Sequence, residues 1–213
     1  MEDPMRSYAG YPRVHDGVLS SYREDILVRN ARGYDRLYGR FLPRSLESRI
    51  LDAGCGTGSF LYYLLRQGYR NCHGIDLCRD SIDFVRRHIT DQCEQGDVPD
   101  YLRANPRSYD AIVMNEVLEH IAKDRVIPLL GAARESLRAG GVLLILIPNM
   151  ENPITAYTRW HDFTHETGYT QNSVRMILRW AGFGESTVYG ASELGQRSFR
   201  ALLLKPARFI TRK

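Results

Sequence analysis

The sequence has few cysteines and no long apolar run, and each absence removes a class of protein. Four cysteines occur among 213 residues, none in a C-x-x-C pair, which disfavours a disulfide scaffold or a zinc finger. No unbroken apolar run is longer than residues 142–147, whereas a membrane-spanning helix needs about 20. The N-terminal stretch MEDPMRSYAG lacks the apolar segment of a secretory signal. These features predict reduced thiols, no transmembrane segment and a cytoplasmic location.

The chain also lacks a strong excess of one charge. Lys and Arg number 29 against 25 Asp and Glu, which gives a formal net charge of +4. A large nucleic-acid footprint needs a concentrated positive surface, so this balance disfavours nucleic acid as a partner. Hydrophobic residues make up 43% and charged residues 25%, the proportions of an ordinary globular domain, which excludes wholesale disorder.

Three segments are predicted along the chain. Residues 1–48 form an N-terminal extension with a helix over residues 21–41, which opens on the S-x-x-E spacing of a capping box. Two alternatives stay open for this helix: it packs on the main domain, or it closes as a lid over a ligand. Residues 49–204 form the main domain. Residues 205–213 form a basic tail, either a solvated end or a weak contact with an anionic membrane surface.

Apolar strands and amphipathic helices alternate within the main domain. This alternation predicts an α/β fold, a mostly parallel sheet with helices on both faces. A long helix over residues 122–138 is expected to end at Gly140 and Gly141, which would serve as its C-cap. The predicted strands are 49–53, 71–75, 92–95, 109–114, 142–147, 185–189 and 198–204, and the other helices are 59–67, 81–88 and 172–180.

A glycine-rich turn follows the first predicted strand. Gly54, Gly56 and Gly58 permit positive φ angles and let a ligand approach the backbone closely. In open α/β sheets, ligands bind at the carboxyl ends of the strands, where this turn lies. The spacing matches neither the dinucleotide fingerprint nor a phosphate loop, and Asp52 would repel a phosphate. A nucleoside with a cationic amino-acid end fits this pattern better.

Acidic residues follow at the ends of the next two predicted strands. Asp76 comes about 20 residues after the glycine turn, where a carboxylate can accept hydrogen bonds from both hydroxyls of a ribose. Asp97 follows Gly96 and is placed to meet an adenine amino group. The turn and the two acids together predict a site for an adenosine-containing ligand.

The segments LDAGCGTGSF, GIDLC, GD and YDAIVMNEVLEHI, in this order and spacing, resemble the class I S-adenosylmethionine-dependent methyltransferases. The resemblance covers residues 48–204 and implies a Rossmann-like, seven-stranded, mostly parallel sheet whose last strand is antiparallel. It also implies S-adenosyl-L-methionine as the cofactor. The implied cofactor-binding residues are Asp52, Gly54, Cys55, Gly56, Thr57, Gly58, Asp76, Leu77, Asp97, Val98 and Asn115.

Oxygen and nitrogen ligands follow the fourth predicted strand. Glu116, Glu119 and His120 stand at i, i+3 and i+4, so in a helical turn they would point to one side. His165 follows the fifth strand, and loops after neighbouring strands lie side by side. Carboxylates and imidazoles suit Mg²⁺ or Mn²⁺, so these four residues are a candidate metal site, with a role as plain loop anchors as the alternative. Without a metal, His165, His120 or His161 is the candidate catalytic base.

The E-x-x-E-H pattern with its distal histidine is similar to the ubiquinone-pathway O-methyltransferases and to the small-RNA ribose 2′-O-methyltransferases. The stretch from Ile147 to Phe183 resembles methyltransferases of bacterial polysaccharide and glycolipid synthesis, which implies a saccharide hydroxyl as the acceptor. Four aromatic residues of this stretch can stack on sugar faces or simply pack the loop: Tyr157, Trp160, Phe163 and Tyr169.

The sequence therefore predicts an S-adenosylmethionine-dependent O-methyltransferase that acts on a small-molecule or glycoconjugate acceptor, first of all a saccharide hydroxyl, with Mg²⁺ or Mn²⁺ as an aid. The alternative acceptors are a quinone or phenol precursor and a terminal RNA ribose. An alternative of another class is a catalytically inactive nucleoside-binding or scaffold protein, which would bind the cofactor and methylate nothing. The oligomeric state stays open.

Overall fold

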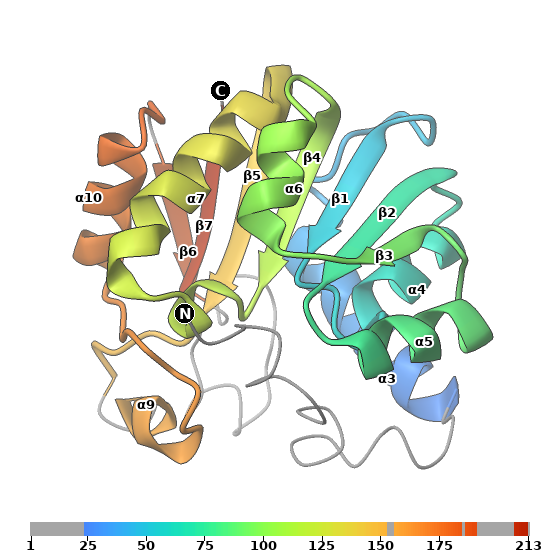
Figure 1. Ribbon diagram of the computed structural model, residues 1–213, viewed down its shortest axis with the longest axis horizontal. Coiled ribbons are helices and arrows are strands. Elements are labelled where there is room, and N and C mark those ends of the chain that lie inside the picture. Colours follow the sequence, from blue (N-terminus) through green and yellow to red (C-terminus); the bar gives the residue numbers. More distant parts are fainter. Residues whose placement is uncertain (1–23, 153–155, 185, 191–206, 213) are drawn as a thin grey trace.

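A computed structural model describes residues 24–152, 156–184, 186–190 and 207–212. Within these ranges, seven strands form one sheet in the order β3-β2-β1-β4-β5-β7-β6 (Figure 1). The first five strands of this order are parallel to one another, and β7 runs antiparallel to both of its neighbours. The predicted α/β, Rossmann-like fold is therefore confirmed.

The elements follow one another in the alternation that the sequence predicted. The strands are β1 (Arg49–Ala53), β2 (Asn71–Asp76), β3 (Cys93–Gln95), β4 (Tyr109–Asn115), β5 (Leu137–Ile147), β6 (Ser186–Gly190) and β7 (Ala207–Arg212). The helices are α3 (Glu24–Tyr38), α4 (Ser59–Arg66), α5 (Arg79–His88), α6 (Val98–Ala104), η2 (Leu118–His120, 3-10), α7 (Lys123–Ser136), α9 (Thr158–His161) and α10 (Gln171–Trp180). None of the helices in the described ranges combines the length and apolar character that crossing a membrane requires.

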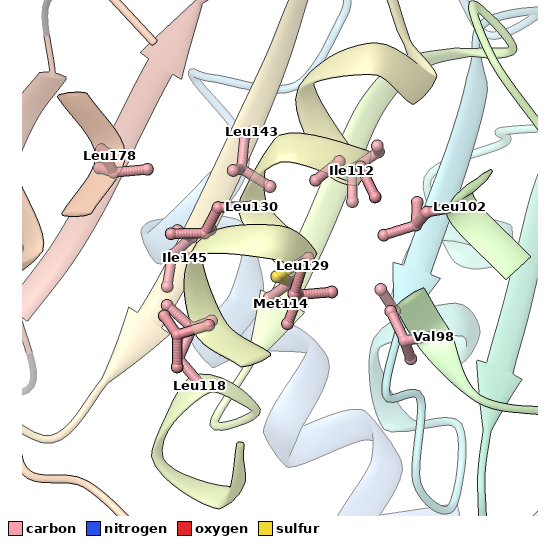
Figure 2. Packing of buried hydrophobic residues seen from close by; sticks show 14 of the residues in the cluster. Val98, Leu102, Ile112, Met114, Leu118, Leu129, Leu130, Leu143, Ile145 and Leu178 are labelled. Carbon is pink, nitrogen blue, oxygen red and sulfur yellow. The ribbon is translucent and has the colours of Figure 1, made fainter. Parts of the chain in front are cut away.

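Helices cover both faces of the sheet, so the central strands are buried on two sides. Along β4, Ile112 and Met114 belong to the core under α6, α7 and α10, whereas Ala111 and Val113 belong to the core under α3, α4 and α5. Figure 2 shows Leu129 and the sheet residues of the first core in close packing. Because successive strand residues point to opposite faces, a strand that is buried on both faces needs a continuous apolar run.

The N-terminal helix α3 packs on the main domain. Its residues Leu27, Leu37 and Tyr38 are buried. The rings of Tyr34 and Tyr38 each lie 5.2 Å from the ring of Phe60 in α4, in edge-to-face contacts. Of the two alternatives for this helix, the contacts of the described part favour packing. The helix ends at Tyr38 rather than at residue 41, and residues 21–23 lie outside the described residues.

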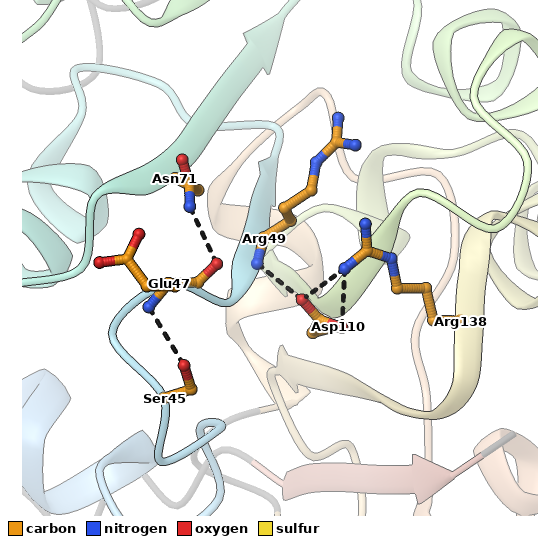
Figure 3. A network of polar contacts seen from close by, with 6 residues as sticks. All are labelled: Ser45, Glu47, Arg49, Asn71, Asp110 and Arg138. Atoms are coloured by element: carbon orange, nitrogen blue, oxygen red, sulfur yellow. Dashed lines mark hydrogen bonds and ion pairs between the residues drawn. The ribbon is translucent and has the colours of Figure 1, made fainter.

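Polar contacts connect the parallel strands at their N-terminal ends (Figure 3). The backbone N–H of Arg49 donates to the carboxylate of Asp110 over 2.7 Å. The guanidinium of Arg138 donates to the same carboxylate over 3.1 Å. The side-chain amide of Asn71 donates to the carbonyl of Glu47 over 2.9 Å. These contacts hold β1, β2, β4 and β5 together at their N-terminal ends. The C-terminal ends of the same strands remain available for a functional site.

The position of the last strand differs from the prediction. β7 spans Ala207–Arg212, inside the segment that the sequence predicted as a basic tail, whereas the predicted strand 198–204 lies outside the described residues. The backbone of β7 pairs with β5 from Val142 to Ile147. The tail prediction is wrong for these residues, because β5 would otherwise present an edge of unpaired N–H and C=O groups.

The end of α7 also differs from the prediction. The helix stops at Ser136, and β5 begins at once with Leu137. Gly140 and Gly141 are therefore not a helix cap. They lie in β5 where its register with β4 shifts, and Gly140 has a φ of 77°. The helix α6 was not predicted, because its 7 residues are too few to show a helical repeat.

Two glycine substitutions test how tightly the sheet packs under the site. A Cβ at Gly74 in β2 would lie 2.6 Å from Leu61 Cδ1 and 3.0 Å from Cys55 Sγ. We expect Gly74→Ala to lower the free energy of unfolding by about 1–3 kcal/mol through overpacking. The control is Gly131→Ala in α7, where a Cβ meets nothing within 4 Å, and it should raise stability by up to about 1 kcal/mol. Urea unfolding measures both, and equal effects of the two substitutions would contradict the packing.

Candidate active site

The turn after β1 places backbone groups at the C-terminal ends of the parallel strands. Gly54, Gly56 and Gly58 have φ values of 81°, 49° and 78°, which only glycine adopts without strain. The N–H groups of Gly54 and Cys55 both donate to the carbonyl of Ile75, at 2.8 and 3.0 Å. The first turn after β1 is thus fixed against the end of β2.

The glycines of this turn differ in what surrounds them. A Cβ at Gly54 would lie 2.5 Å from Val117 Cγ2, and a Cβ at Gly58 would lie 2.8 Å from Val85 Cγ2. A Cβ at Gly56 would meet nothing within 4 Å. Protein therefore fills the space beside Gly54 and Gly58, while the space beside Gly56 is open for a ligand. Thr57 follows in the same turn and is half-buried.

Asp52 is the most unusual carboxylate of the site. Its side chain is 1% exposed, and no donor meets either carboxylate oxygen in good hydrogen-bond geometry. Burial raises the pKa of Asp52 to about 8, and the negative charge of Asp76 adds to this shift, whereas the side chain of Asn115 acts in the opposite direction. A cationic amino group would supply the missing partner, so Asp52 could hold the ammonium of a bound amino acid.

Asp76 closes the turn from the end of β2. One carboxylate oxygen accepts the N–H of Gly56 over 2.8 Å, and the other accepts the N–H of Cys78 over 2.8 Å. Burial raises the pKa of Asp76, and the two N–H bonds oppose this rise. Each oxygen keeps a free lone pair, so the carboxylate could also accept the two hydroxyls of a ribose.

Asp97 stands at the start of α6, beyond the end of β3. One of its oxygens accepts a hydrogen bond from the guanidinium of Arg125 over 2.8 Å. The other oxygen is buried and has no hydrogen-bond partner, so it could accept an adenine amino group. Val98 is buried beside it as the first residue of α6, and Leu77 is half-buried after β2. Sequence reasoning missed Arg125, which no motif distinguishes from other helical arginines.

Asn115 links the site to the N-terminal helix. Its side-chain oxygen accepts a hydrogen bond from the hydroxyl of Tyr38, which is buried at the end of α3. The side-chain nitrogen of Asn115 is buried, and the Asn115 side chain stabilises the charged form of Asp52. Sequence reasoning missed Tyr38 because 77 residues separate the pair and no local pattern indicates such a contact.

Cys55 is not a nucleophile in this site. Its side chain is 7% exposed, and burial, together with the charges of Asp52 and Asp76, raises the pKa of the Cys55 thiol well above its usual value. The thiol therefore stays protonated near neutral pH. Cys55 fills space between the turn and Gly74 in β2, which explains why a small side chain stands there.

A second cluster forms where the chain leaves β4. Glu119, His120 and His165 each bring one potential ligand atom within 4.8 Å of the others. The side chain of Glu119 is 2% exposed, and neither of its oxygens has a hydrogen-bond partner. Burial raises the pKa of Glu119 well above its usual value, and the charge of Glu116 adds to the rise. The ring centroids of His120 and His165 are 4.7 Å apart.

The structure does not bring Glu116 into this cluster. The sequence predicted one helical turn for Glu116, Glu119 and His120, but the 3-10 helix begins only at Leu118. Glu116 has a φ of 53°, and its N–H donates to the carbonyl of Leu146 over 2.8 Å. The predicted shared helical turn is therefore wrong, and the exposed Glu116 lies outside the group of ligand atoms within 4.8 Å, although its charge is near enough to raise the pKa of Glu119.

The aromatic residues after β5 separate into buried and exposed members. Tyr169 is 4% exposed, and its hydroxyl donates to the carbonyl of Leu118, so it packs the loop and offers no stacking face. Three residues around α9 are exposed: Tyr157 at 66%, Trp160 at 78% and Phe163 at 101%. The exposed ring of His161 lies 5.6 Å from that of Tyr157, outside the cluster with Glu119.

A parallel sheet with a glycine turn after β1 and carboxylates at the ends of β1, β2 and β3 is typical of Rossmann-like folds, a class that binds adenosine-containing cofactors at these strand ends. The profile of the family described as "Methyltransferase domain" matches residues 22–184, and the chain belongs to this family. It is an S-adenosyl-L-methionine-dependent methyltransferase, which confirms the predicted enzyme class and cofactor.

Curated relatives match part of the chain. The ubiquinone biosynthesis O-methyltransferase of Methylocella silvestris is 36% identical over 112 residues, which are 49% of this chain and 42% of that protein. The protein of the same name from Xylella fastidiosa is 34% identical over 103 residues, 46% of this chain and 41% of that protein. The chain thus spans less than half the length of these relatives.

Solved structures share the fold over almost the whole chain. A methyltransferase from Archaeoglobus fulgidus has 19% identity and a TM-score of 0.69, and the match covers 95% of this chain and all of that chain (100%). Phosphoethanolamine N-methyltransferase 2 of Haemonchus contortus, in complex with S-adenosyl-L-methionine, has 16% identity and a TM-score of 0.70 over 99% of this chain and 60% of that chain. At such identities the likeness concerns the fold alone.

The buried Asp52 predicts a pH dependence of stability. The folded protein without cofactor holds a proton on Asp52 up to pH about 8, whereas the unfolded chain releases it near 3.8. The folded state then binds more protons between these values, so the free energy of unfolding should fall as pH rises from about 4 to about 8. Asp52→Asn should flatten this slope, and the exposed Asp83→Asn in α5 should not. Urea unfolding across this range checks both, and a D52N slope equal to that of the wild type would refute the assignment.

Asp76 predicts a loss of cofactor affinity. Asp76→Ala removes a carboxylate that could bind both ribose hydroxyls, and bonds to charged acceptors contribute about 1.5–3 kcal/mol. We expect the affinity for S-adenosylhomocysteine, measured by calorimetry, to fall roughly 10- to 150-fold. Asp83→Ala, whose partner Arg79 is exposed, serves as the control. A folded D76A protein with unchanged affinity would exclude the ribose role.

Proposed function

We propose that the enzyme methylates an oxygen, and that this oxygen is a phenolic hydroxyl with a second oxygen beside it, as in a quinone precursor. One observation carries the proposal: the buried Glu119 carboxylate, without a hydrogen-bond partner, lies beside His120 and His165. An amine attacks with a lone pair that it already has, whereas a hydroxyl must lose its proton. The cluster offers the groups that this loss requires.

The relatives support a phenol over a saccharide. Both curated relatives described above carry the name ubiquinone biosynthesis O-methyltransferase. The saccharide acceptor, which the sequence favoured first, is not named in either of these two relatives. A terminal RNA ribose is disfavoured by the net charge of +4, which is small for a protein that follows a phosphate backbone.

The residues around the glycine turn would hold the cofactor. Asp52 would pair with the ammonium, Asp76 would accept the ribose hydroxyls and Asp97 would accept the adenine amino group, each through oxygens that lack or can add a partner. When bound, S-adenosyl-L-methionine supplies a methyl group on a positively charged sulfur. An imidazole of the cluster would accept the proton of the acceptor hydroxyl, so that its oxygen can take this methyl group.

The same cluster fits a divalent cation. Glu119, His120 and His165 would hold Mg²⁺ or Mn²⁺, because a buried carboxylate without a partner and two imidazoles form a mixed oxygen and nitrogen donor set. When bound, such an ion supplies the positive charge that lowers the pKa of an acceptor hydroxyl. Two adjacent oxygens on the acceptor would suit that arrangement better than a single hydroxyl.

A saccharide hydroxyl is the second candidate, because exposed aromatic rings around α9 suit a sugar as well. Tyr157, Trp160 and Phe163 expose their rings around α9, and the guanidinium of Arg159 lies 4.9 Å from the Trp160 ring. Exposed aromatic faces can stack on the apolar face of a sugar ring as well as on a phenol. The two candidates therefore share the surface and differ in the acidity of the hydroxyl.

Calorimetric titration of Mn²⁺ tests the metal part of the proposal. The protein is saturated with S-adenosylhomocysteine, and wild type is compared with Glu119→Gln and His165→Ala. We expect the wild type to bind one equivalent and both variants to lose at least about 10- to 100-fold in affinity. His161→Ala, an exposed histidine outside the cluster, should bind as the wild type does. Absence of binding to the wild type would discard the metal and leave an imidazole as the base.

Methyl transfer to defined acceptors tests the substrate class. Catechols, monophenols and sugars with adjacent hydroxyls are each incubated with S-adenosyl-L-methionine, and S-adenosylhomocysteine is quantified. We expect the highest kcat/KM with catechols, because a phenol of pKa about 10 loses its proton far more readily than an alcohol. Transfer to sugars alone would refute the phenol proposal and support the second candidate.

A further inference from the structure

Three residues beside the cluster form a chain of hydrogen bonds. The side chain of Asp162 is buried, 7% exposed, at the end of α9. One of its oxygens accepts both the N–H of Thr164 over 2.9 Å and the hydroxyl of Thr164 over 2.7 Å. The same hydroxyl oxygen lies 2.9 Å from Nδ1 of His120. The loop after α9 thus reaches the 3-10 helix after β4 through Thr164.

The chemistry of these groups fixes the direction of each bond. A carboxylate only accepts hydrogen bonds, and a hydroxyl has a single hydrogen to donate. The Thr164 hydrogen is used toward Asp162, so the Thr164 oxygen acts as the acceptor toward His120. Nδ1 of His120 must therefore carry a hydrogen. In a neutral imidazole the lone pair then lies on Nε2.

We propose that Asp162 and Thr164 are positioning residues that hold His120 in its Nδ1–H tautomer, so that the lone pair of the neutral imidazole lies on Nε2. The use of that lone pair, as a metal ligand or as a base, rests on the function proposed above. The tautomer itself does not, because it follows from the hydrogen bonds of the protein alone. Neither residue is among the catalytic, cofactor-binding or metal-binding residues that the sequence predicted.

The position of Asp162 supports a role at this site rather than in loop folding alone. Its second oxygen lies 3.9 Å from Nε2 of His165, the other histidine of the cluster. This distance exceeds a hydrogen bond, so the carboxylate acts on His165 through its charge. One buried carboxylate therefore faces both imidazoles, directly for His165 and through Thr164 for His120. In metal sites, a carboxylate or backbone carbonyl that does not itself bind the metal commonly accepts a hydrogen bond from a ligating histidine and so fixes its orientation.

Nitrogen NMR of the histidine side chains tests the tautomer directly. The chain has six histidines, so the two-bond correlations of ¹⁵N-labelled imidazoles are few, and loss of one set in His120→Gln assigns His120. Spectra are recorded without metal at a pH where the rings are neutral. The variants are Thr164→Val, which removes the hydroxyl, and Thr164→Ser, which restores it. The control is Thr90→Val, a residue in the turn between α5 and β3.

The expected spectrum of the wild type shows His120 with a protonated Nδ1 and a pyridine-like Nε2. Thr164→Val should shift His120 toward the other tautomer or an averaged state, whereas Thr164→Ser and Thr90→Val should keep the pattern of the wild type. A wild-type His120 that is protonated on Nε2, or that averages between tautomers, would overturn the inference even if no variant folds. A Thr164→Val spectrum identical to that of the wild type would overturn it as well.

Mn²⁺ titration of the same variants separates this inference from the proposed function. If the wild type binds Mn²⁺, Thr164→Val should bind it about 10- to 100-fold more weakly, and Thr164→Ser should bind close to the wild-type value. Equal affinity of Thr164→Val and wild type would count against the positioning role. If the wild type binds no Mn²⁺, the metal part of the proposed function fails, and the NMR spectra alone decide the tautomer.

Discussion

Carboxylates that the fold buries without partners are the constraint on which this structure depends. Asp52 and Glu119 are 1% and 2% exposed, and no donor meets any of their four oxygens in good hydrogen-bond geometry. Burying a polar group without a partner costs a few kcal/mol, and burying a lone charge costs more, so both groups hold their protons more tightly. The two apolar cores must offset this cost. A cationic ligand at either carboxylate would relieve it, which explains why the ligand edge of the sheet is built around them.

The two ends of the parallel strands show the difference between a carboxylate that stabilises the fold and one that is available to a ligand. Asp110, at the edge where the parallel strands begin, accepts the N–H of Arg49 and the guanidinium of Arg138, so its hydrogen-bonding capacity serves the fold. Asp52 lies on the strand β1 that Arg49 starts, yet it has no such partner. The short strand β1 thus runs from one end of the sheet, where the Asp110 carboxylate is hydrogen-bonded, to the opposite end, where the Asp52 carboxylate is not. Rossmann-like folds bind their cofactors at this opposite end, the C-terminal end of the parallel strands.

Much of the fold could be predicted because local sequence determines it. The strands from β1 to β4 begin and end within about two residues of the prediction. For the central strands β1 and β4 the reason is burial on both faces, which demands continuous apolar runs. α6 was missed because a short helix shows no repeat, and β7 because its pairing with β5 depends on an exposed strand edge rather than on its own composition. Glu116 was misplaced because its positive φ has no signal in the sequence.

The residues of the site also differ in how well the local sequence predicts them. The proposed cofactor residues lie at or just after the C-terminal end of a parallel strand, so a linear motif places them, and the structure brings these strand ends together. Other contacts join segments that are distant in the sequence: 44 residues separate His120 from Thr164 beside the cluster, and 77 separate Tyr38 in α3 from Asn115 in β4. Loops vary more readily than strands, because they carry few of the core contacts. Changes around α9 can therefore alter the acceptor while the cofactor edge, anchored in β1 to β3, stays intact.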